Sequence, residues 1–220
     1  VRLRETGGLV NIQATNAPHM LFSEDNVVAK FNHNKSQWGL FYNLSARNFK
    51  KTYTDIDETY VLENKTIHRV QEGLHDQNKH FTHNIDLSYN LTEQDKYVFN
   101  VVFRNSVYDA PCLNQSNKLY DAADADNYIF SRLKNKQSSY TPSLDLYYQR
   151  TLPKNQMLTM SVTGTLMHTD NNRLYHEYTP QAEDLAMLET DVTGNKRSII
   201  GEAIYDKRFK SLVFSSGLRH

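Results

Sequence analysis

The stretch that decides the fold is Ile85-Asp86-Leu87-Ser88-Tyr89-Asn90-Leu91, in which apolar and polar residues alternate without a break. Successive side chains of a β-strand point to opposite faces, so this pattern predicts a strand with one apolar and one polar face. The same alternation occurs in residues 38–44, where only Phe41 interrupts it, and in residues 158–166. These segments predict long β-strands rather than helices.

Further segments bring the prediction to about eight long strands. Shorter or weaker forms of the alternation occur at residues 27–31, 97–103, 144–148, 199–205 and 212–218. The chain also contains 14 tyrosines and 10 phenylalanines but only 8 glycines and 5 prolines, a composition that favours strands. We therefore predict an all-β fold with antiparallel strands.

Turn and loop signals divide these strands into hairpins. Tight turns are predicted at four places, about 60 residues apart: 34–35, 93–95, 153–155 and 210–211. Long polar loops of about 30 residues are predicted at three places: near 52–79, 109–140 and 170–196. The tight turns would then lie at one end of the strands and the long loops at the other.

The turns also predict which residues face each other across each hairpin. At the first turn Phe31 faces Trp38, and at the last turn Ala203 faces Leu218. For the turn at 93–95 the predicted facing pairs are Leu91 with Tyr97, Tyr89 with Phe99, Leu87 with Val101, and Asn84 with Arg104. Apolar residues meet apolar residues in these registers, and a slip of one residue would invert the faces.

Both a soluble sandwich and a membrane barrel alternate in this way, but three features favour the barrel. The predicted strands have about 10 to 15 residues, longer than the usual 5 or 6. Their polar face carries full charges, which suit a water-filled lumen better than a packed core. Short turns opposite long loops match periplasmic turns and extracellular loops. We predict part of an antiparallel up-and-down transmembrane β-barrel.

This prediction assigns the two faces of the strands. The lumen-facing candidates are Lys30, Arg47, Asn84, Asp86, Arg104, Asp145, Glu202, Asp206 and Arg219. The lipid-facing candidates are Trp38, Leu40, Tyr42, Leu87, Tyr89, Phe99, Val101, Leu146, Met160 and Leu218. Four tyrosines in the predicted loops are candidates for ligand contact, because aromatic faces bind sugars and chelates: Tyr120, Tyr128, Tyr175 and Tyr178.

Composition excludes several classes of protein. The mean hydropathy is −0.68, and the chain lacks the roughly 18 consecutive apolar residues of a membrane helix. The 25 basic and 25 acidic residues cancel, so no basic excess indicates a nucleic-acid partner. The single cysteine, Cys112, cannot form an internal disulfide. A low mean hydropathy is what a barrel wall would have, since half of its residues meet water.

Several segments resemble a known family, the outer-membrane β-barrel region of TonB-dependent receptor-like proteins of Bacteroidota. The resemblance is carried by four segments, at residues 35–42, 95–100, 143–150 and 200–205. The opening Gly7-Gly8-Leu9-Val10-Asn11-Ile12 resembles the segment that ends the plug domain of that family. Residues 1–20 are therefore expected to be the end of a plug and its lead-in, and residues 21–220 the N-terminal part of the barrel.

The resemblance also implies a function. Such receptors sit in the bacterial outer membrane as barrels of about 22 strands, and an inner-membrane energising complex draws a ligand through them. It implies membrane lipid, the protein's own plug, that complex and an unidentified ligand (a glycan, peptide or metal chelate) as partners, and no nucleic acid. The chain ends within a predicted strand, so we expect a fragment of a larger barrel.

No signature of catalysis or of a cofactor was found, and we predict neither an enzyme nor a metal site. The chain has no GxGxxG, P-loop, GxSxG, HExxH or CxxC motif. His80 and His83 are three apart and would point to opposite faces of a strand. His168 and Asp170 would share a face, but two ligands without a third make a weak site.

Two other functions fit the same pattern. One is a soluble secreted antiparallel β binding module, for instance for glycans, with the long loops as its binding surface. The other is a small closed eight-stranded outer-membrane barrel, because eight strands can close. Dependence on detergent would separate the two membrane barrels from the soluble module.

Overall fold

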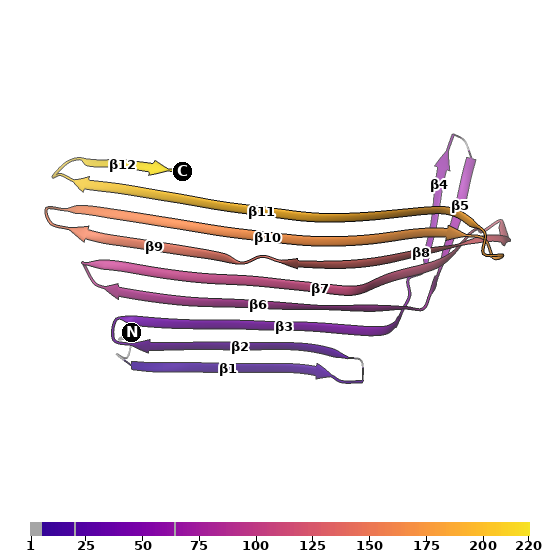
Figure 1. Ribbon diagram of the computed structural model, residues 1–220, viewed down its shortest axis with the longest axis horizontal. Coiled ribbons are helices and arrows are strands. Elements are labelled where there is room, and N and C mark those ends of the chain that lie inside the picture. The colour runs from indigo at the N-terminus through magenta and orange to yellow at the C-terminus, as the bar shows by residue number, and fades with distance from the viewer. Residues whose placement is uncertain (1–5, 20, 64) are drawn as a thin grey trace.

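The computed structural model describes residues 6–19, 21–63 and 65–220, which form one antiparallel sheet of twelve strands. Figure 1 shows the strands side by side in a single layer. Their bounds are β1 Thr6–Ala17, β2 Phe22–His33, β3 Ser36–Thr52, β4 Ile56–Leu62, β5 Lys65–Leu74, β6 Asp76–Glu93, β7 Tyr97–Asp121, β8 Asp124–Tyr140, β9 Ser143–Leu152, β10 Gln156–Tyr178, β11 Asp184–Arg208 and β12 Val213–Arg219. The all-β, antiparallel prediction is confirmed, whereas the count of eight strands is wrong.

The four additional strands lie where the sequence predicted a lead-in or loops. β4, β5 and β8 occupy predicted loops, and β7, β10 and β11 run through the loop positions to reach 25, 23 and 25 residues. Polar residues occur on both faces of these segments and apolar ones do not recur at every second position, so the segments lack the alternation that marks a half-buried strand. Backbone hydrogen bonds to neighbouring strands hold these segments extended. Such bonds require no particular pattern of polar and apolar side chains, so the sequence does not reveal them.

The N-terminal strand β1 belongs to the same sheet as the rest of the chain. Each of its twelve residues pairs with a residue of β2, from Thr6 opposite His33 to Ala17 opposite Phe22. Residues 1–5 and 20, which the expected plug segment includes, lie outside the described residues. The division of the chain near residue 20 stays a prediction.

The four tight turns lie where the sequence predicted them. Each of the turns at 34–35, 93–96 and 153–155 contains Asn, Asp or Lys in the left-handed region, with φ of 51° at Asn34, 61° at Asp95, 62° at Lys154 and 56° at Asn155. Asn and Asp tolerate this conformation better than other non-glycine residues, which explains three of the four positions. The last turn closes where the Phe209 amide donates to the Leu212 carbonyl at 2.7 Å.

The register agrees with the prediction at two hairpins and differs at one. Phe31 lies opposite Trp38, and Ala203 lies opposite Leu218, as predicted. In the hairpin of β6 and β7 the pairing is shifted by two residues, so the observed pairs are Leu91 with Phe99, Tyr89 with Val101, Leu87 with Phe103, Asn84 with Ser106 and Asp86 with Arg104. The turn there is longer than predicted, and a shift of two keeps every side chain on its predicted face.

Two prolines interrupt the ladder. At Pro111 the register of β7 shifts against both neighbouring strands. The shift against β6 falls between Lys79 and Phe81, and the shift against β8 falls between Ala110 and Leu113. Proline has no backbone N–H to donate, so it is found in strands at bulges and edges. Pro142 lies in the break between β8 and β9, which follow each other along the same course between β7 and β10.

The strand order is β1-β2-β3-β6-β7-β8-β10-β11-β12, with β9 paired to β7 and β10. β4 and β5 form a hairpin that leaves this path, and only β5 pairs with the sheet, against the distal end of β7. Figure 1 shows this hairpin standing off the sheet at the end opposite the tight turns, which we call the distal end. β1 and β12 do not pair with each other in the described residues, so the alternative of a closed eight-stranded barrel is not what forms.

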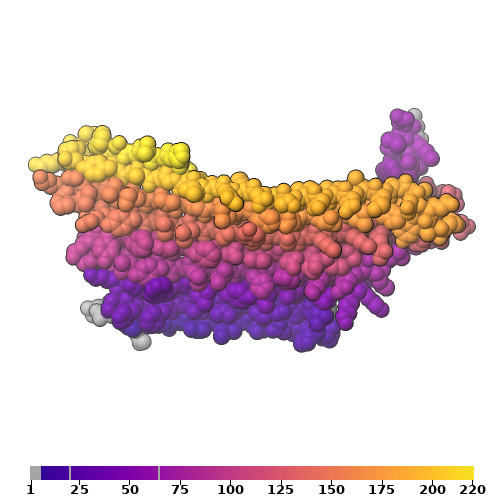
Figure 2. Space-filling view, viewed as in Figure 1, coloured from indigo at the N-terminus to yellow at the C-terminus, as the bar shows by residue number. Residues whose placement is uncertain are grey.

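The sheet has almost no buried core. Among the described apolar residues only Ala110 and Leu119 are buried, at 0% and 6% exposure. The space-filling view in Figure 2 shows the face of the sheet turned to the viewer, with the β4–β5 hairpin projecting beyond the strands at the distal end. Both faces of the sheet are therefore available to contact something other than this part of the chain.

Candidate functional site

One face of the sheet carries a continuous apolar surface. Cross-strand partners share a face, and so do residues two apart along a strand. By this rule all ten residues predicted to face lipid lie on the apolar surface. We call its central part the apolar band; it consists of Phe31, Trp38, Leu40, Leu87, Tyr89, Val101, Phe103, Leu144, Leu146, Met160, Val162 and Ala203, which are cross-strand partners or neighbours two apart. Trp38, at its turn end, is 54% exposed.

Aromatic residues mark both edges of the apolar band. At the turn end the rings of Trp38 and Tyr89 lie 4.3 Å apart, and Tyr89 meets Phe99 edge to face at 6.4 Å. At the distal edge the Tyr140 ring lies 5.2 Å from His168. Val107, the partner of Tyr140, is eight residues from Phe99 along β7, a distance of about 27 Å. At a strand tilt of about 35° this length corresponds to a height of about 22 Å, close to the roughly 25 Å apolar height of a membrane barrel.

The hairpins are staggered by a constant amount. One row of cross-strand partners serves as the reference line from which the residues to each turn are counted. It consists of Trp38, Tyr89, Val101, Leu146, Val162 and Gly201. The last pairs before the turns lie two, four, six and eight residues from that row, at His33–Ser36, Glu93–Tyr97, Leu152–Gln156 and Phe209–Leu212. One residue of stagger per strand corresponds to a strand tilt of about 35°, given roughly 3.3 Å per residue and 4.8 Å between strands.

The opposite face is polar, and the nine lumen-facing candidates all lie on it. Its amides and charges bond across strands: Asn43 donates to Asn26 at 2.8 Å, and Asn84 donates to Asn43 at 3.3 Å. Arg104 forms an ion pair with Asp145, which also accepts from the Thr163 hydroxyl at 2.8 Å. These bonds connect the strands and leave polar groups on a water-accessible surface.

On this face, charged residues that lie opposite each other do not always form ion pairs. Arg104 lies opposite Asp86 rather than Asn84, yet its ion-pair partner is Asp145 on the neighbouring strand. Glu202 lies opposite Arg219, the neighbour of the predicted Ala203–Leu218 pair, but no ion pair joins the two in the described part of the chain. Asp206 instead accepts a hydrogen bond from Ser215.

Glu93 connects two tight turns. Its carboxylate accepts from Lys96 of its own turn at 2.7 Å and pairs with Lys35 of the β2–β3 turn at 2.9 Å. The hydrogen bonds from Lys96 and Lys35 lower the pKa of Glu93 from 4.5 to about 2. No sequence pattern predicts this contact, because the pairing of β3 with β6 brings Lys35 and Glu93 together.

The four candidate tyrosines lie in strands rather than in loops, which corrects the prediction. Tyr120, Tyr128 and Tyr178 share the face of the apolar band at the distal end, whereas Tyr175 points to the polar face. The Lys118 ammonium lies 4.8 Å from the Tyr120 ring and 4.5 Å from the Tyr128 ring. Burial and a hydrogen bond to Glu177 raise the pKa of Tyr175 to about 12. These side chains therefore have protein partners at the distal end.

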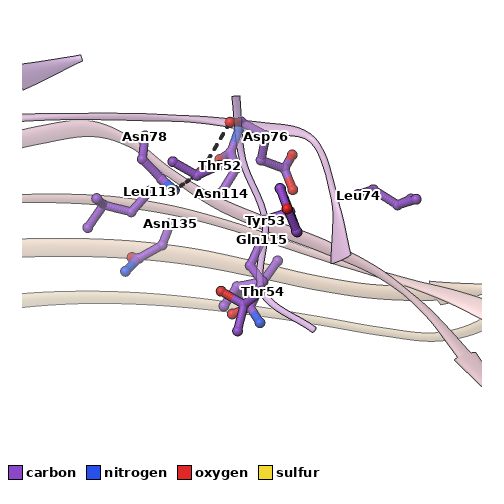
Figure 3. A pocket seen from close by; sticks show the side chains of 11 residues that line it. Thr52, Tyr53, Thr54, Leu74, Asp76, Asn78, Leu113, Asn114, Gln115 and Asn135 are labelled. Carbon is purple, nitrogen blue, oxygen red and sulfur yellow. Dashed lines mark hydrogen bonds between the residues drawn. The ribbon is translucent and has the colours of Figure 1, made fainter. Parts of the chain in front are cut away.

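A pocket of about 270 Å³ opens on the polar face near the foot of the β4–β5 hairpin (Figure 3). The segment after β3 crosses the sheet there, and it approaches so closely that a Cβ at Gly73 would lie 2.6 Å from the Thr54 backbone nitrogen. Asp76 is 8% exposed, and its Oδ1 accepts from the Ser116 hydroxyl at 3.1 Å. The lining is otherwise neutral, with Thr52, Tyr53, Thr54, Leu74, Asn78, Leu113, Asn114, Gln115, Leu133 and Asn135.

The arrangement of this pocket suits the binding of polar groups. Hydroxyl and amide side chains from β3, β6, β7 and β8 converge there, and Thr52 donates to the Asp76 carbonyl at 3.2 Å. Sequence reasoning missed the pocket, because it assigned residues 52–79 and 109–140 to loops. The alternation of the neighbouring strands carries no information about where such polar segments meet.

No group of three or more His, Cys, Asp or Glu side chains with metal-site geometry occurs among the described residues. His168 and Asp170 share a face, as predicted, and their side chains bond at 2.8 Å. His168 also bonds the Asn195 amide oxygen at 2.8 Å, and Thr193 donates to Asp170 at 2.8 Å. This network joins β10 to β11 at the distal edge of the apolar band.

Comparison with known proteins does not identify the chain: no family model, no curated protein and no solved structure matches it. In the described part of the chain there is no helix long and apolar enough to cross a membrane.

Proposed function

We propose that this chain forms part of the wall of a bacterial outer-membrane β-barrel of the TonB-dependent receptor type, which takes up a ligand and carries out no covalent chemistry. The observation that supports this most is the apolar band on one face of a staggered, single-layer sheet, with a hydrogen-bonded polar face behind it. Lipid would contact the band, and water and the ligand would contact the polar face.

Within residues 6–19, 21–63 and 65–220 no second layer covers the apolar face, and this exposure favours a membrane wall over a soluble binding module. A soluble sandwich covers its apolar face with another sheet, and a core of interdigitating side chains results. Here Leu87, Val162 and Leu218 are 43%, 43% and 77% exposed on the apolar face. Hydrocarbon would cover these side chains without any further protein.

The stagger supports a wall that curves into a barrel. Strands of a closed barrel tilt by about 35–45°, and the register must step steadily from strand to strand to allow it. The tilt of about 35° that follows from the four turns falls at the lower end of this range. In the part of the chain that the structure describes, β1 and β12 each pair on one side, and further strands would pair with their other edges to complete the wall.

The remaining parts of the proposal rest on the sequence resemblance. They are a plug inside the barrel, an inner-membrane energising complex, and a glycan, peptide or metal chelate as the transported ligand. The pocket beside Asp76 faces the side where that ligand would pass, and hydroxyl and amide groups line it. Its position at the distal end corresponds to the extracellular side, where a ligand arrives.

Two adjacent substitutions test the face assignment. Val162→Arg puts a charge in the middle of the apolar band, whereas Ser161→Arg puts it on the polar face opposite Glu202. A lipid-facing arginine near the middle of a bilayer costs about 2–4 kcal/mol. We expect Val162→Arg to lower the free energy of unfolding from lipid vesicles by about that amount, and Ser161→Arg to change it by less than about 1 kcal/mol.

The measurement is a urea titration of the protein reconstituted in phospholipid vesicles. Equal losses for the two variants would contradict the assignment of the faces. A wild-type chain that folds and stays monodisperse in plain buffer would contradict the membrane proposal as a whole.

A further inference from the structure

Three cations form a stripe on the same face as the apolar band, beyond its distal edge. Arg132, Lys134 and Lys136 alternate along β8, so their side chains point to one side, and all three are exposed. None of them forms an ion pair within residues that the structure describes. We call these residues the basic stripe.

The charge of β8 is confined to this face. The residues between the three cations, Leu133 and Asn135, are neutral and line the pocket on the polar face. The nearest carboxylates on the face of the stripe form no ion pair with it. Asp109 and Asp170 lie diagonally from Lys136 across β7 and β10, and Asp170 is already bonded to His168 and Thr193. Asp184, which bonds His176, and Glu189 and Asp191 lie two strands away on β11. Two strand spacings amount to about 10 Å, beyond the reach of an ion pair.

The height of the basic stripe above the apolar band indicates which part of a lipid the three cations would contact. Tyr140 marks the distal edge of the apolar band on the same strand, and Lys136, Lys134 and Arg132 lie four, six and eight residues beyond it. At a tilt of about 35° these cations stand roughly 11, 16 and 22 Å above that edge. The headgroup layer of an ordinary phospholipid is only about 5–8 Å thick.

We propose that the basic stripe binds the phosphate groups of a glycolipid whose phosphorylated saccharide headgroup rises along the wall. This inference rests on the proposed membrane function, because it requires lipid against the apolar band. A saccharide headgroup is tall enough to reach all three cations, and lysine and arginine bind phosphate by charge-assisted hydrogen bonds. The acyl chains of the same lipid would cover the apolar band below.

The test compares two triple variants of the protein in neutral detergent micelles. Arg132→Gln with Lys134→Gln and Lys136→Gln removes the stripe, and Lys207→Gln with Arg208→Gln and Lys210→Gln removes three cations at the turn end. The probe is lipopolysaccharide with a phosphorylated core saccharide, and binding is measured by titration at low salt. One cation near a charged lipid surface contributes about fivefold in affinity, so we expect a loss of roughly 100-fold for the stripe variant. The turn-end variant should lose less than about threefold.

Dephosphorylated lipopolysaccharide and inorganic phosphate complete the test. The wild type should bind the dephosphorylated lipid about as weakly as the stripe variant does, and inorganic phosphate should compete only at high concentration. Equal binding by the two triple variants, or equal binding of the two lipids by the wild type, would overturn the inference. Either result leaves the membrane proposal standing, because both variants would still fold in micelles; failure to enter micelles at all would instead contradict the proposed function.

Discussion

At the scale of single residues, side chains far apart in the sequence fix how neighbouring hairpins meet. Glu93 pairs with Lys35 of one turn and Lys96 of the next, and Asn43 connects Asn26 to Asn84 across three strands. Apart from the local pair of Glu93 with Lys96, each contact joins segments that the sheet brings together. Such contacts add to the backbone ladder and favour one register over the others.

Glu93 predicts a dependence of stability on pH. Its pKa is lower in the folded protein, about 2, than the ordinary 4.5, so its ion pairs stabilise the fold above pH 4.5 and are lost as the pH falls through about 2. We expect Glu93→Gln to lose less stability than the wild type between pH 4.5 and 2, in urea titrations of the micelle-bound protein. Asp95→Asn, in the same turn, is the control and should follow the wild-type profile. Identical profiles for Glu93→Gln and the wild type would rule out this role.

At the scale of strands, the sequence predicted well where one face is apolar and poorly where both are polar. The alternation around Leu87 and around Val162 was enough to predict those strands, their faces and the adjoining turns. It did not predict β4, β5 or β8, because these segments are held by backbone pairs and by polar contacts such as Tyr120 with Glu72. The alternation also could not predict the two-residue shift of register at the β6–β7 turn, since a shift of two residues leaves every side chain on the same face.

The candidate functional site also has one part that the sequence predicted, the two faces of the sheet, and one part that it did not, the pocket. The two faces were predictable from the period of two, since each strand carries that information by itself. The pocket beside Asp76 was not, because it depends on the crossing of the segment after β3 over Gly73. The bulge at Pro111 had a visible signal in the proline, which cannot donate to the ladder.

The β4–β5 hairpin is predicted to be dispensable for the wall. Ile56 and Gln71 face each other at its base, so a short Gly-Ser linker can replace residues 57–70. Only the distal end of β7 and the residue after it would lose amide partners: the Tyr120 amide lies in a hydrogen-bonded pair with Val70, and the Ala122 amide donates to the His68 carbonyl at 2.8 Å. Hydrogen exchange should therefore speed up at those two amides and stay slow from Tyr97 to Asp109. Loss of protection throughout β7 would show that the hairpin is needed to form the sheet.

At the scale of the whole molecule, the constant stagger of the turns makes a prediction about orientation. If the apolar band lies level with the membrane, the strands must cross it at about 35° to the membrane normal. Polarised infrared spectroscopy of oriented bilayers measures this tilt from the amide I dichroism. A tilt near zero, or no preferred orientation, would contradict a wall built with one residue of stagger per strand.

The central claim is that the apolar band meets lipid hydrocarbon, and the single tryptophan of the chain tests it directly. Trp38 lies in the band beside Tyr89 and is 54% exposed. In vesicles made with brominated acyl chains, its fluorescence should be strongly quenched relative to vesicles of unbrominated lipid, while aqueous iodide should have little effect. Full quenching by iodide with no quenching by the brominated lipid would contradict the account.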